Sequence, residues 1–337
     1  MVSRARPLGE RGLAIGRQTL LSGLVHRVEV KRHLGAGEIA AVSELLDLAT
    51  EADHHHPLGE HQWLDLVQGG REGFAGLVAW GDADHPVGYA QVSRGPSGPS
   101  SGQSVPTSWA VELVVEPTRR ETQGRAIGHD LLAAALDIVN DEGGGHVHLW
   151  VSKPCEWQHD VATGVGLIQG RDLLQMRRPL PVEGEEWAVT TRPFVPGQDE
   201  EAWLTVNNRA FAWHPEQGGW DLDTLLRREA EAWFDPAGFL LHEDDGVLAG
   251  FCWTKVHADH DPPLGEIYVI AVDPDVAGRG LGRALTVAGL DHLARRGIDW
   301  GMLYVDGGND PAVHLYKDMG FTIDHVDRAY TADIAPR

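Results

Sequence analysis

The chain has 337 residues, of which 28 are basic and 50 are acidic, so its formal net charge at pH 7 is −22. This acidic balance argues against nucleic acid or an anionic membrane surface as a partner, and no apolar run approaches the roughly 20 residues that a membrane-spanning helix needs. A chain of this length is longer than most chains that fold around a single hydrophobic core, so we expect two domains.

The start of the chain and its cysteines indicate where the protein acts. Residues 1–26 carry arginines that interrupt short apolar runs, a pattern that could be mistaken for a targeting segment. We interpret this segment instead as a disordered N-terminal extension. Cys155 and Cys252 have no paired spacing, and no signal peptide is recognised, so a reduced, cytoplasmic setting is expected.

Two halves of the chain resemble each other. The segments VGYAQVS, VELVVEP and GRAIGHDLLAAAL in the first half are echoed by AGFCWTK, GEIYVIAVDP and GRGLGRALTVAGL in the second. Aligning Gly128 with Gly282 places the two copies a whole domain's length apart. We therefore expect an α/β fold with mixed sheets in two tandem domains, residues 27–178 and residues 188–337, joined by a linker at residues 179–187.

A glycine-rich turn follows an apolar strand in the second copy. Residues 267–272 form a β-branched and aromatic run, Asp273-Pro274 ends it, and helical spacing resumes at Ala284. Unpaired N–H groups and the helix dipole at such a helix start favour an anion, most often a phosphate. The turn by itself is equally compatible with an ordinary tight connection. Three glycines occupy alternate positions within it: Gly278, Gly280 and Gly282.

Two common phosphate loops do not fit this turn, whereas a third loop does. A dinucleotide fingerprint would need glycine where Arg283 stands, and no P-loop GK[ST] sequence occurs here. The turn resembles the pyrophosphate loop of the GCN5-related N-acetyltransferases, in which Gln or Arg is followed by two residues, Gly, one residue, and Gly or Ala. Gly280 and Gly282 fit this pattern, while Ala277 replaces the usual Gln or Arg, so one side-chain contact is lost and the backbone cradle remains.

The resemblance implies that acetyl-CoA is the co-substrate and shows where it would bind. Its pantetheine arm would lie along a strand bulge at Ile270, Ala271 and Val272, with a second contact at Asn309. If the first copy also binds a coenzyme, the corresponding strand residues are Leu113, Val114 and Val115. The diphosphate would lie on the turn, at Ala277, Gly278, Arg279, Gly280, Leu281, Gly282 and Arg283.

Amide formation from a thioester needs a base for the attacking ammonium and an acid for the departing thiolate. Glu266, on the strand that feeds the turn, and Tyr316, on the following short helix, supply such a pair in the second copy. The corresponding residues of the first copy are Trp109 and Ala162, neither of which can move a proton. We therefore predict that residues 188–337 are catalytic and that residues 27–178 are not.

Several longer motifs point to the acceptor. HPEQGGW, EAWFDP, WTKVH, QMRRPL and the GEIYV strand are similar to the mycothiol synthases, tandem acetyltransferases of actinobacteria, and the similarity covers about residues 28–334. It implies acetylation of the cysteinyl amine of a cysteine–glucosamine–inositol conjugate, the last step of mycothiol biosynthesis. Such a ligand needs many hydrogen-bond partners, and carboxylates suit its cationic amine. The residues that the resemblance assigns to the acceptor are Glu60, Glu216, Lys255, Glu266 and Tyr304.

Two other functions remain open from the sequence. The same fold could act on a different amine, such as an aminoglycoside or a protein N-terminus, or the chain could be a non-catalytic acyl-CoA sensor. The retained acid and base argue against a sensor. The histidines in HHHPLGEH and HADHD could be drawn as metal ligands, but adjacent loop residues seldom converge on one ion, so we expect no metal and place His257 near the acceptor. We also expect a monomer.

Overall fold

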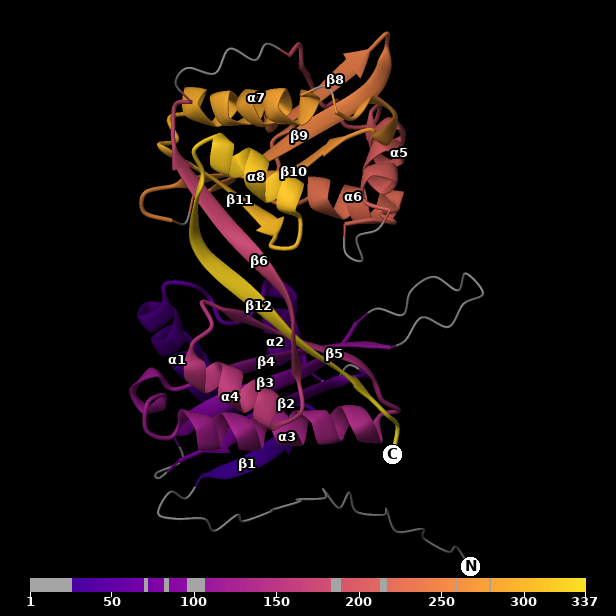
Figure 1. The fold of residues 1–337 in the computed structure, drawn as a ribbon. Coiled ribbons are helices and arrows are strands. Elements are labelled where there is room, and N and C mark those ends of the chain that lie inside the picture. The colour runs from indigo at the N-terminus through magenta and orange to yellow at the C-terminus, as the bar shows by residue number, and fades with distance from the viewer. Residues whose placement is uncertain are drawn as a thin grey trace, which may run out of the picture. The chain divides into compact units, whose positions relative to one another are not determined.

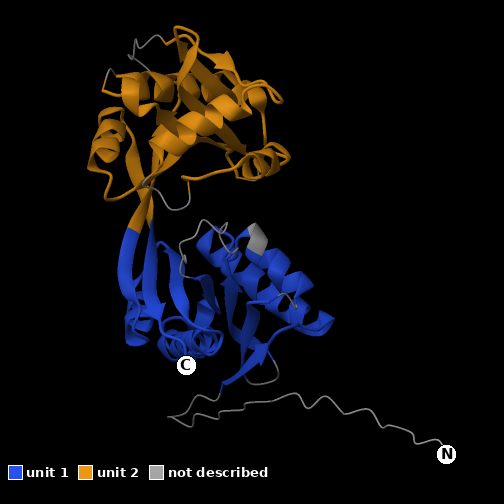
Figure 2. Cartoon of the chain, turned by 90° about the vertical axis from the view of Figure 1, so that its right-hand side faces the viewer, with its two compact units in different colours: residues 1–171, 327–337 blue, residues 172–326 orange. Residues whose placement is uncertain are grey.

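The computed structural model describes residues 26–69, 72–81, 85–95, 107–182, 189–212, 217–258, 260–278 and 280–337. The predicted extension, apart from its last residue, and residues 183–187 of the predicted linker lie outside these ranges, as do the predicted site residues Glu216 and Arg279. The chain divides into two compact units (Figure 2). Unit 1 comprises residues 1–171 and 327–337, and unit 2 comprises residues 172–326.

Unit 1 is a mixed sheet with strand order β1-β2-β3-β4-β5-β12, covered by helices on both faces (Figure 1). Helices α1 and α2 contribute to one core cluster, and α3 and α4 contribute to the other. The strands are β1 (Arg27–Lys31), β2 (Phe74–Trp80), β3 (Pro86–Arg94), β4 (Ser108–Val115), β5 (Gly145–Ser152) and β12 (Thr322–Ile334). The helices are α1 (Ala36–Asp53), α2 (Glu60–Gln68), α3 (Gly124–Asp141) and α4 (Glu156–Gly164), with a 3₁₀ turn at Pro117–Arg119.

Unit 2 repeats this plan with strand order β6-β11-β10-β9-β8-β7. Helices α7 and α8 cover one face of the sheet, and α5 and α6 cover the other face over a cluster rich in aromatic side chains. The strands are β6 (Ile168–Pro179), β7 (Arg192–Pro193), β8 (Phe239–Asp244), β9 (Val247–His257), β10 (Leu264–Val272) and β11 (Trp300–Asp306). The helices are α5 (Glu200–Ala210), α6 (Leu222–Glu229), α7 (Leu281–Arg295) and α8 (Asp310–Asp318), with 3₁₀ turns at Pro236–Gly238 and Pro274–Val276.

Each unit contains one parallel strand pair, and the first strand of that pair leads into the turn before the unit's long helix. In unit 1, β4 pairs with β5 in parallel over residues 108–111 and 146–149. In unit 2, β10 pairs with β11 in parallel over residues 265–267 and 301–303. The other described strand pairs within each unit are antiparallel. The predicted mixed α/β fold is therefore confirmed.

The last strand of each sequence copy completes the sheet of the other unit. Strand β6 ends the first copy but pairs with β11 of unit 2, with Leu173 opposite Asp306 and Pro179 opposite Trp300. Strand β12 ends the second copy but pairs with β5 of unit 1 through residues 327–334. Local sequence patterns predict a strand without specifying its partner, so the compact units begin and end at other residues than the sequence copies.

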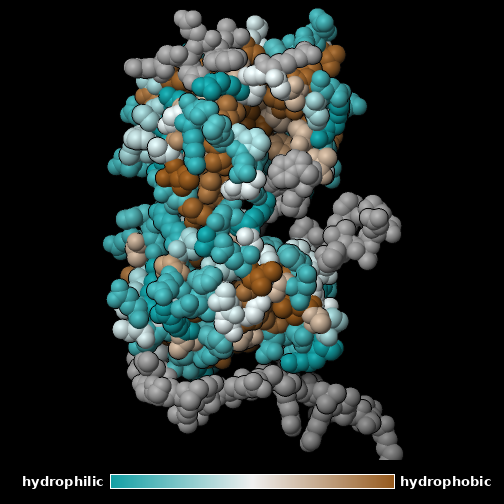
Figure 3. All heavy atoms as spheres, viewed as in Figure 1, coloured by the Kyte–Doolittle hydropathy of each residue, from teal (hydrophilic) through white to brown (hydrophobic). Residues whose placement is uncertain are grey.

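The surface is mainly hydrophilic on the side that Figure 3 shows. Hydrophilic side chains cover most of the face seen in Figure 3, and apolar side chains appear there as separate patches. Within the described part of the chain, no helix is both long enough and apolar enough to cross a membrane.

The strand exchange predicts where core mutations act. Met176 on β6 and Tyr330 on β12 are both fully buried, in the cores of unit 2 and unit 1 respectively. Met176→Ala and Tyr330→Ala should each lower the free energy of unfolding by about 2–5 kcal/mol, because each leaves a cavity. Hydrogen exchange should show lost protection in β10 and β11 for the first variant, and in β4 and β5 for the second.

Ile168→Ala serves as the control for this comparison, because Ile168 begins β6 but is 67% exposed. It should change stability by no more than about 0.5 kcal/mol. Loss of amide protection in unit 1 after Met176→Ala, or in unit 2 after Tyr330→Ala, would contradict the assignment of β6 to unit 2 and of β12 to unit 1.

Candidate active site

The central opening of unit 2 lies where β10 and β11 part. Their parallel pairing ends at Ile267 and Leu303, while β10 continues to Val272 paired only with β9 among the described strands. The edge of β10 that faces β11 therefore has backbone N–H and C=O groups without a strand partner. An extended ligand with amide groups can dock on such an edge as an added strand. The predicted arm-binding residues Ile270, Ala271 and Val272 lie on this edge.

The glycine-rich turn presents its backbone to open space. Gly278 and Gly280 have φ values of +83° and +78°, which a residue with a Cβ rarely adopts. A Cβ on Gly278 would meet no atom within 4 Å, and one on Gly282 would meet only Val272 Cγ2 at 4.0 Å. Among the described residues, no side chain caps the start of α7 at Gly280, and a helix start of this kind favours an anion. These features fit a coenzyme diphosphate, with Ala277 in extended conformation just before the cradle.

A β-bulge determines which side chains of β10 reach the aromatic face of the sheet. The register with β9 shifts between Ile267 and Val269, so Tyr268 is an extra residue in the strand. The irregularity therefore lies just before the expected bulge at residues 270–272. Tyr268 turns toward the aromatic cluster, where its ring centroid is 4.9 Å from that of Trp233 and 5.3 Å from that of Trp253.

Glu266 is the buried carboxylate of this face, with only 7% of its surface exposed. Its Oε2 lies 2.7 Å from Nε2 of His257 at the end of β9. Lys255 is directly opposite Glu266 in the strand register, but its Nζ stands over the rings of Trp233 and Tyr268, 4.7 Å and 5.7 Å from their centroids. The lysine charge is thus held by aromatic faces, a cation–π arrangement, while the histidine holds the carboxylate.

Tyr316 approaches the opening from the opposite face of the sheet. It lies near the end of α8 in the core cluster of α7 and α8, with 8% of its surface exposed and its ring edge-on to Phe321. Burial, with a smaller effect of the neighbouring Cys252, raises the pKa of the Tyr316 hydroxyl above its usual range. The phenol therefore stays protonated and can act as an acid. No hydrogen bond joins Tyr316 to Glu266 in the structure.

Asn309 and Tyr304 are placed by hydrogen bonds. Asn309 caps α8, and its Oδ1 accepts from the Ala312 amide at 3.3 Å, which leaves its side-chain N–H groups for another partner. The Tyr304 hydroxyl, on β11 just past the paired rungs, accepts from Gln175 Nε2 at 2.6 Å. Gln175 in turn accepts from Arg177 Nε at 2.7 Å.

The sequence reasoning assigned no role to Gln175 and Arg177. Both belong to the QMRRPL motif, which was noted as part of the family resemblance, and both lie on β6, the strand that completes the sheet of unit 2. The motif match was the signal that could have identified them. Glu60, by contrast, is the first residue of α2 in unit 1.

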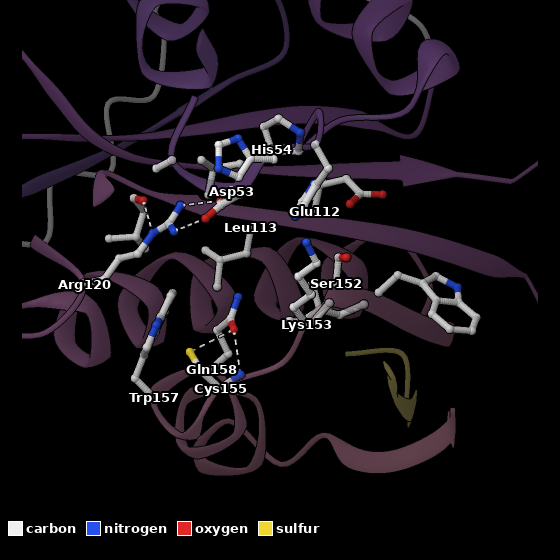
Figure 4. A pocket seen from close by; sticks show the side chains of 18 residues that line it. Asp53, His54, Glu112, Leu113, Arg120, Ser152, Lys153, Cys155, Trp157 and Gln158 are labelled. Atoms are coloured by element: carbon white, nitrogen blue, oxygen red, sulfur yellow. Dashed lines mark hydrogen bonds and ion pairs between the residues drawn. The ribbon is translucent and has the colours of Figure 1, made fainter. Parts of the chain in front are cut away.

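Unit 1 has its own cavity between β4 and β5, of about 350 Å³ (Figure 4). Asp53 and Arg120 form a bidentate ion pair in its wall, with distances of 2.5 Å and 2.7 Å. Burial raises the pKa of the Glu112 carboxyl in this wall to about 8. The sequence reasoning missed Glu112, although a carboxylate inside the apolar run VELVV is unusual. The predicted arm-binding residues of the first copy also line the cavity: Leu113, Val114 and Val115.

The positions in unit 1 that correspond to the acid and base are structural. Trp109 is fully buried, and its indole N–H donates to the Gly144 carbonyl at 3.0 Å. Ala162 is also fully buried, in the same core cluster.

The histidine-rich segments engage in local contacts. His55 Nδ1 lies 3.2 Å from the His56 carbonyl oxygen, and His56 Nδ1 lies 3.4 Å from Thr50 Oγ1. His257 contacts Glu266, and its ring packs edge-on to His260. Among the residues that the structure describes, no three His, Cys, Asp or Glu side chains are grouped so as to hold a metal ion.

Comparison with known proteins agrees with this geometry. A model of the acetyltransferase (GNAT) family matches residues 203–321. The chain is 48% identical to the mycothiol acetyltransferase of Thermobispora bispora, over 90% of this chain and 98% of that protein. It is 40% identical to the mycothiol acetyltransferase of Streptomyces coelicolor, over 94% of this chain and 98% of that protein.

Solved structures support the fold. A GCN5-related N-acetyltransferase from Sphaerobacter thermophilus superposes with a TM-score of 0.68 at 23% identity, over 92% of this chain and 96% of that chain. A tandem GNAT protein from the clavulanic acid biosynthesis pathway gives 0.62 at 16% identity, over 92% of this chain and 99% of that chain. The predicted tandem acetyltransferase fold is confirmed, and the protein is an acetyl-CoA-dependent N-acetyltransferase. By its similarity along almost its whole length, the chain belongs to the mycothiol acetyltransferase family.

Proposed function

We propose that this protein transfers the acetyl group of acetyl-CoA to the cysteinyl amine of a cysteine–glucosamine–inositol conjugate, the last step of mycothiol biosynthesis. One observation carries the proposal: a buried carboxylate, Glu266, lies where β10 and β11 part, in a chain whose relatives bear the name mycothiol acetyltransferase. A small-molecule amine is the acceptor class that this name implies.

Glu266 is the general base of the proposed reaction. Its carboxylate takes a proton from the acceptor ammonium, directly or through a water, and so frees the nitrogen lone pair for attack on the thioester carbon. The unpaired edge of β10 at residues 270–272 holds the pantetheine arm and polarises the thioester carbonyl through backbone N–H groups. The turn at residues 277–283 holds the diphosphate.

Tyr316 is the general acid of the proposed reaction. The bond between the carbonyl carbon and sulfur breaks as the amide forms, and the phenol donates its proton to the thiolate. A buried phenol whose pKa is raised remains protonated until the thiolate needs the proton. Asn309, whose Oδ1 caps α8, gives the arm a second contact through its side-chain N–H groups.

The acceptor is recognised by residues of different chemistry. Lys255 offers a cation that aromatic faces hold in place, and Tyr304 offers a phenol oriented by Gln175. Glu266 contributes both to binding and to catalysis. We propose Glu60 and Glu216 as further contacts on the basis of their motifs.

Unit 1 is non-catalytic in this proposal. Trp109 and Ala162, which replace the base and the acid, are buried in its core. The backbone of residues 113–115 lines a cavity that would accommodate a second coenzyme arm. We further propose that the enzyme is a monomer that acts in the cytoplasm, where its two unpaired cysteines, Cys155 and Cys252, remain reduced.

The function is tested by measuring thiol release from acetyl-CoA with a panel of amines. The panel contains the cysteinyl conjugate, glucosamine, an aminoglycoside and a peptide with a free N-terminus. The cysteinyl conjugate should give the highest kcat/KM, and the Glu266→Gln variant should reduce kcat about a hundredfold without changing the KM for acetyl-CoA.

Glu201→Gln is the matched control, because Glu201 is an exposed carboxylate on α5. It should leave both constants unchanged. A higher kcat/KM for another amine would overturn the acceptor, whereas full turnover by Glu266→Gln would overturn the base assignment alone.

Replacing Tyr316 by Phe tests the acid. The ring packing against Phe321 is retained, so folding should be preserved, while kcat should fall at least about tenfold because the thiolate loses its proton donor. Burial raises the pKa of Tyr316, so the wild-type hydroxyl should cause no loss of activity below about pH 10. Both constants and their pH profiles are measured; equal activity of the Phe variant would remove Tyr316 from the mechanism.

Replacing Gly278 by Ala tests the diphosphate cradle. The substitution forces a residue with a Cβ into a left-handed conformation, which costs about 1–2 kcal/mol and should distort the turn. The KM for acetyl-CoA should rise about tenfold, with little change in the KM for the amine. Gly297→Ala is the control, because Gly297 has a similar φ of +79° and equally open surroundings at the other end of α7. Equal effects of the two variants would show that the cradle is not involved.

A further inference from the structure

The carboxylate of Glu266 is held by one neighbour, and this contact has a consequence for catalysis. Among the described residues, the one hydrogen bond to this carboxylate comes from His257, between Nε2 and Oε2 at 2.7 Å. The side chains of both residues are largely buried, with 19% and 9% of their surfaces exposed for His257 and Glu266. We propose that His257 is the positioning residue of the catalytic base, which it holds through Oε2 so that Oε1 is directed to the acceptor amine.

The direction of this hydrogen bond follows from its acceptor. An ionised carboxylate can only accept hydrogen bonds, so Nε2 of His257 must carry the proton. Oε2 is then engaged, and Oε1 is the oxygen left for the ammonium group or for a bridging water. A base that must take a proton along a defined line needs this restriction, because a freely rotating carboxylate would present either oxygen.

The other side chains around Glu266 do not perform this task. Lys255 lies opposite it in the register, yet its ammonium group stands over Trp233 and Tyr268. Glu266 contributes to raising the pKa of Tyr268, after the larger effect of burial, so this phenol is neutral beside the carboxylate. His260 packs edge-on to His257, with ring centroids 5.8 Å apart, so it contacts the histidine of the pair.

The strand geometry explains why the side chain of His257 can reach the carboxylate of Glu266. Lys255 and His257 are two residues apart on β9, so their side chains lie on the same face of the sheet. Glu266 is paired with Lys255 and lies on that face as well. His257 is the diagonal neighbour of Glu266 across the strand pair, close enough for a long side chain. The bulge at Tyr268 lies two residues further along β10, so Glu266 itself stays in regular register with β9.

This inference rests on the proposed function, since it assumes that Glu266 is the base. Its test compares two amides of different length. His257→Gln places an amide N–H near the position of Nε2, whereas His257→Asn carries the same group on a side chain that is one methylene too short. The enzyme is the full chain, assayed with acetyl-CoA and the cysteinyl conjugate.

His257→Asn should lower kcat about tenfold or more, the loss expected for a hydrogen bond to a charged group, and leave the KM for acetyl-CoA unchanged. His257→Gln should keep kcat within about threefold of the wild type.

A double-mutant cycle separates positioning from a general structural effect. In the Glu266→Gln background, His257→Asn should cause no further loss, because His257 acts through the carboxylate. If the losses in kcat of the two single variants multiply in the double variant, the inference is overturned. It is also overturned if the Asn variant has the same kcat as the wild type. If the Asn variant does not fold, His257→Met replaces it as the variant without a donor, with the same expected results.

The outcomes also distinguish this inference from the proposed function. Full activity of Glu266→Gln would refute the base itself. An impaired Glu266→Gln together with a fully active His257→Asn would leave the base intact and refute only the role of His257. His314→Gln, on the exposed surface of α8, is the control for histidine replacement and should change none of these quantities.

Discussion

The parting of β10 from β11 after three parallel rungs is the constraint on which the site depends. A strand edge left without a partner has backbone groups that must be satisfied by something else, and an amide-containing arm is chemically suited to this. The same edge leads into a turn whose left-handed glycines keep the start of α7 open. In the proposed binding mode, this one break in strand pairing would place the arm and the diphosphate along consecutive segments of the chain.

The site also separates charges that would otherwise interfere with one another. In a chain with a net charge of −22, a diphosphate must be bound by local positive potential, and the uncapped helix start supplies it without a basic surface. On the aromatic face, Lys255 rests on two rings while His257 holds Glu266. The cation is thus stabilised by the rings without an ion pair to Glu266, the proposed base.

The two units share a scaffold but differ at the positions proposed for catalysis. Both units contain the parallel strand pair and a helix after the turn, and unit 1 encloses a cavity beside its pair. The buried core residues Trp109 and Ala162 stand in unit 1 where unit 2 has Glu266 and Tyr316, the proposed base and acid. The exchange of β6 and β12 nevertheless makes each unit depend on both sequence copies, and through Gln175 it brings a residue of the first copy to Tyr304 of the second.

The sequence by itself determined the repeated α/β plan, the glycine-rich turn and the contrast of Glu266 and Tyr316 with Trp109 and Ala162, because these depend on residue type and spacing along the chain. It did not reveal that the last strands are exchanged, that the bulge lies at Tyr268, that His257 contacts Glu266, or that Gln175 and Glu112 line the two sites. These features arise from pairing between strands that are distant in sequence. A strand's local pattern specifies which residues face a core, but its partner and register are decided only when the whole sheet forms.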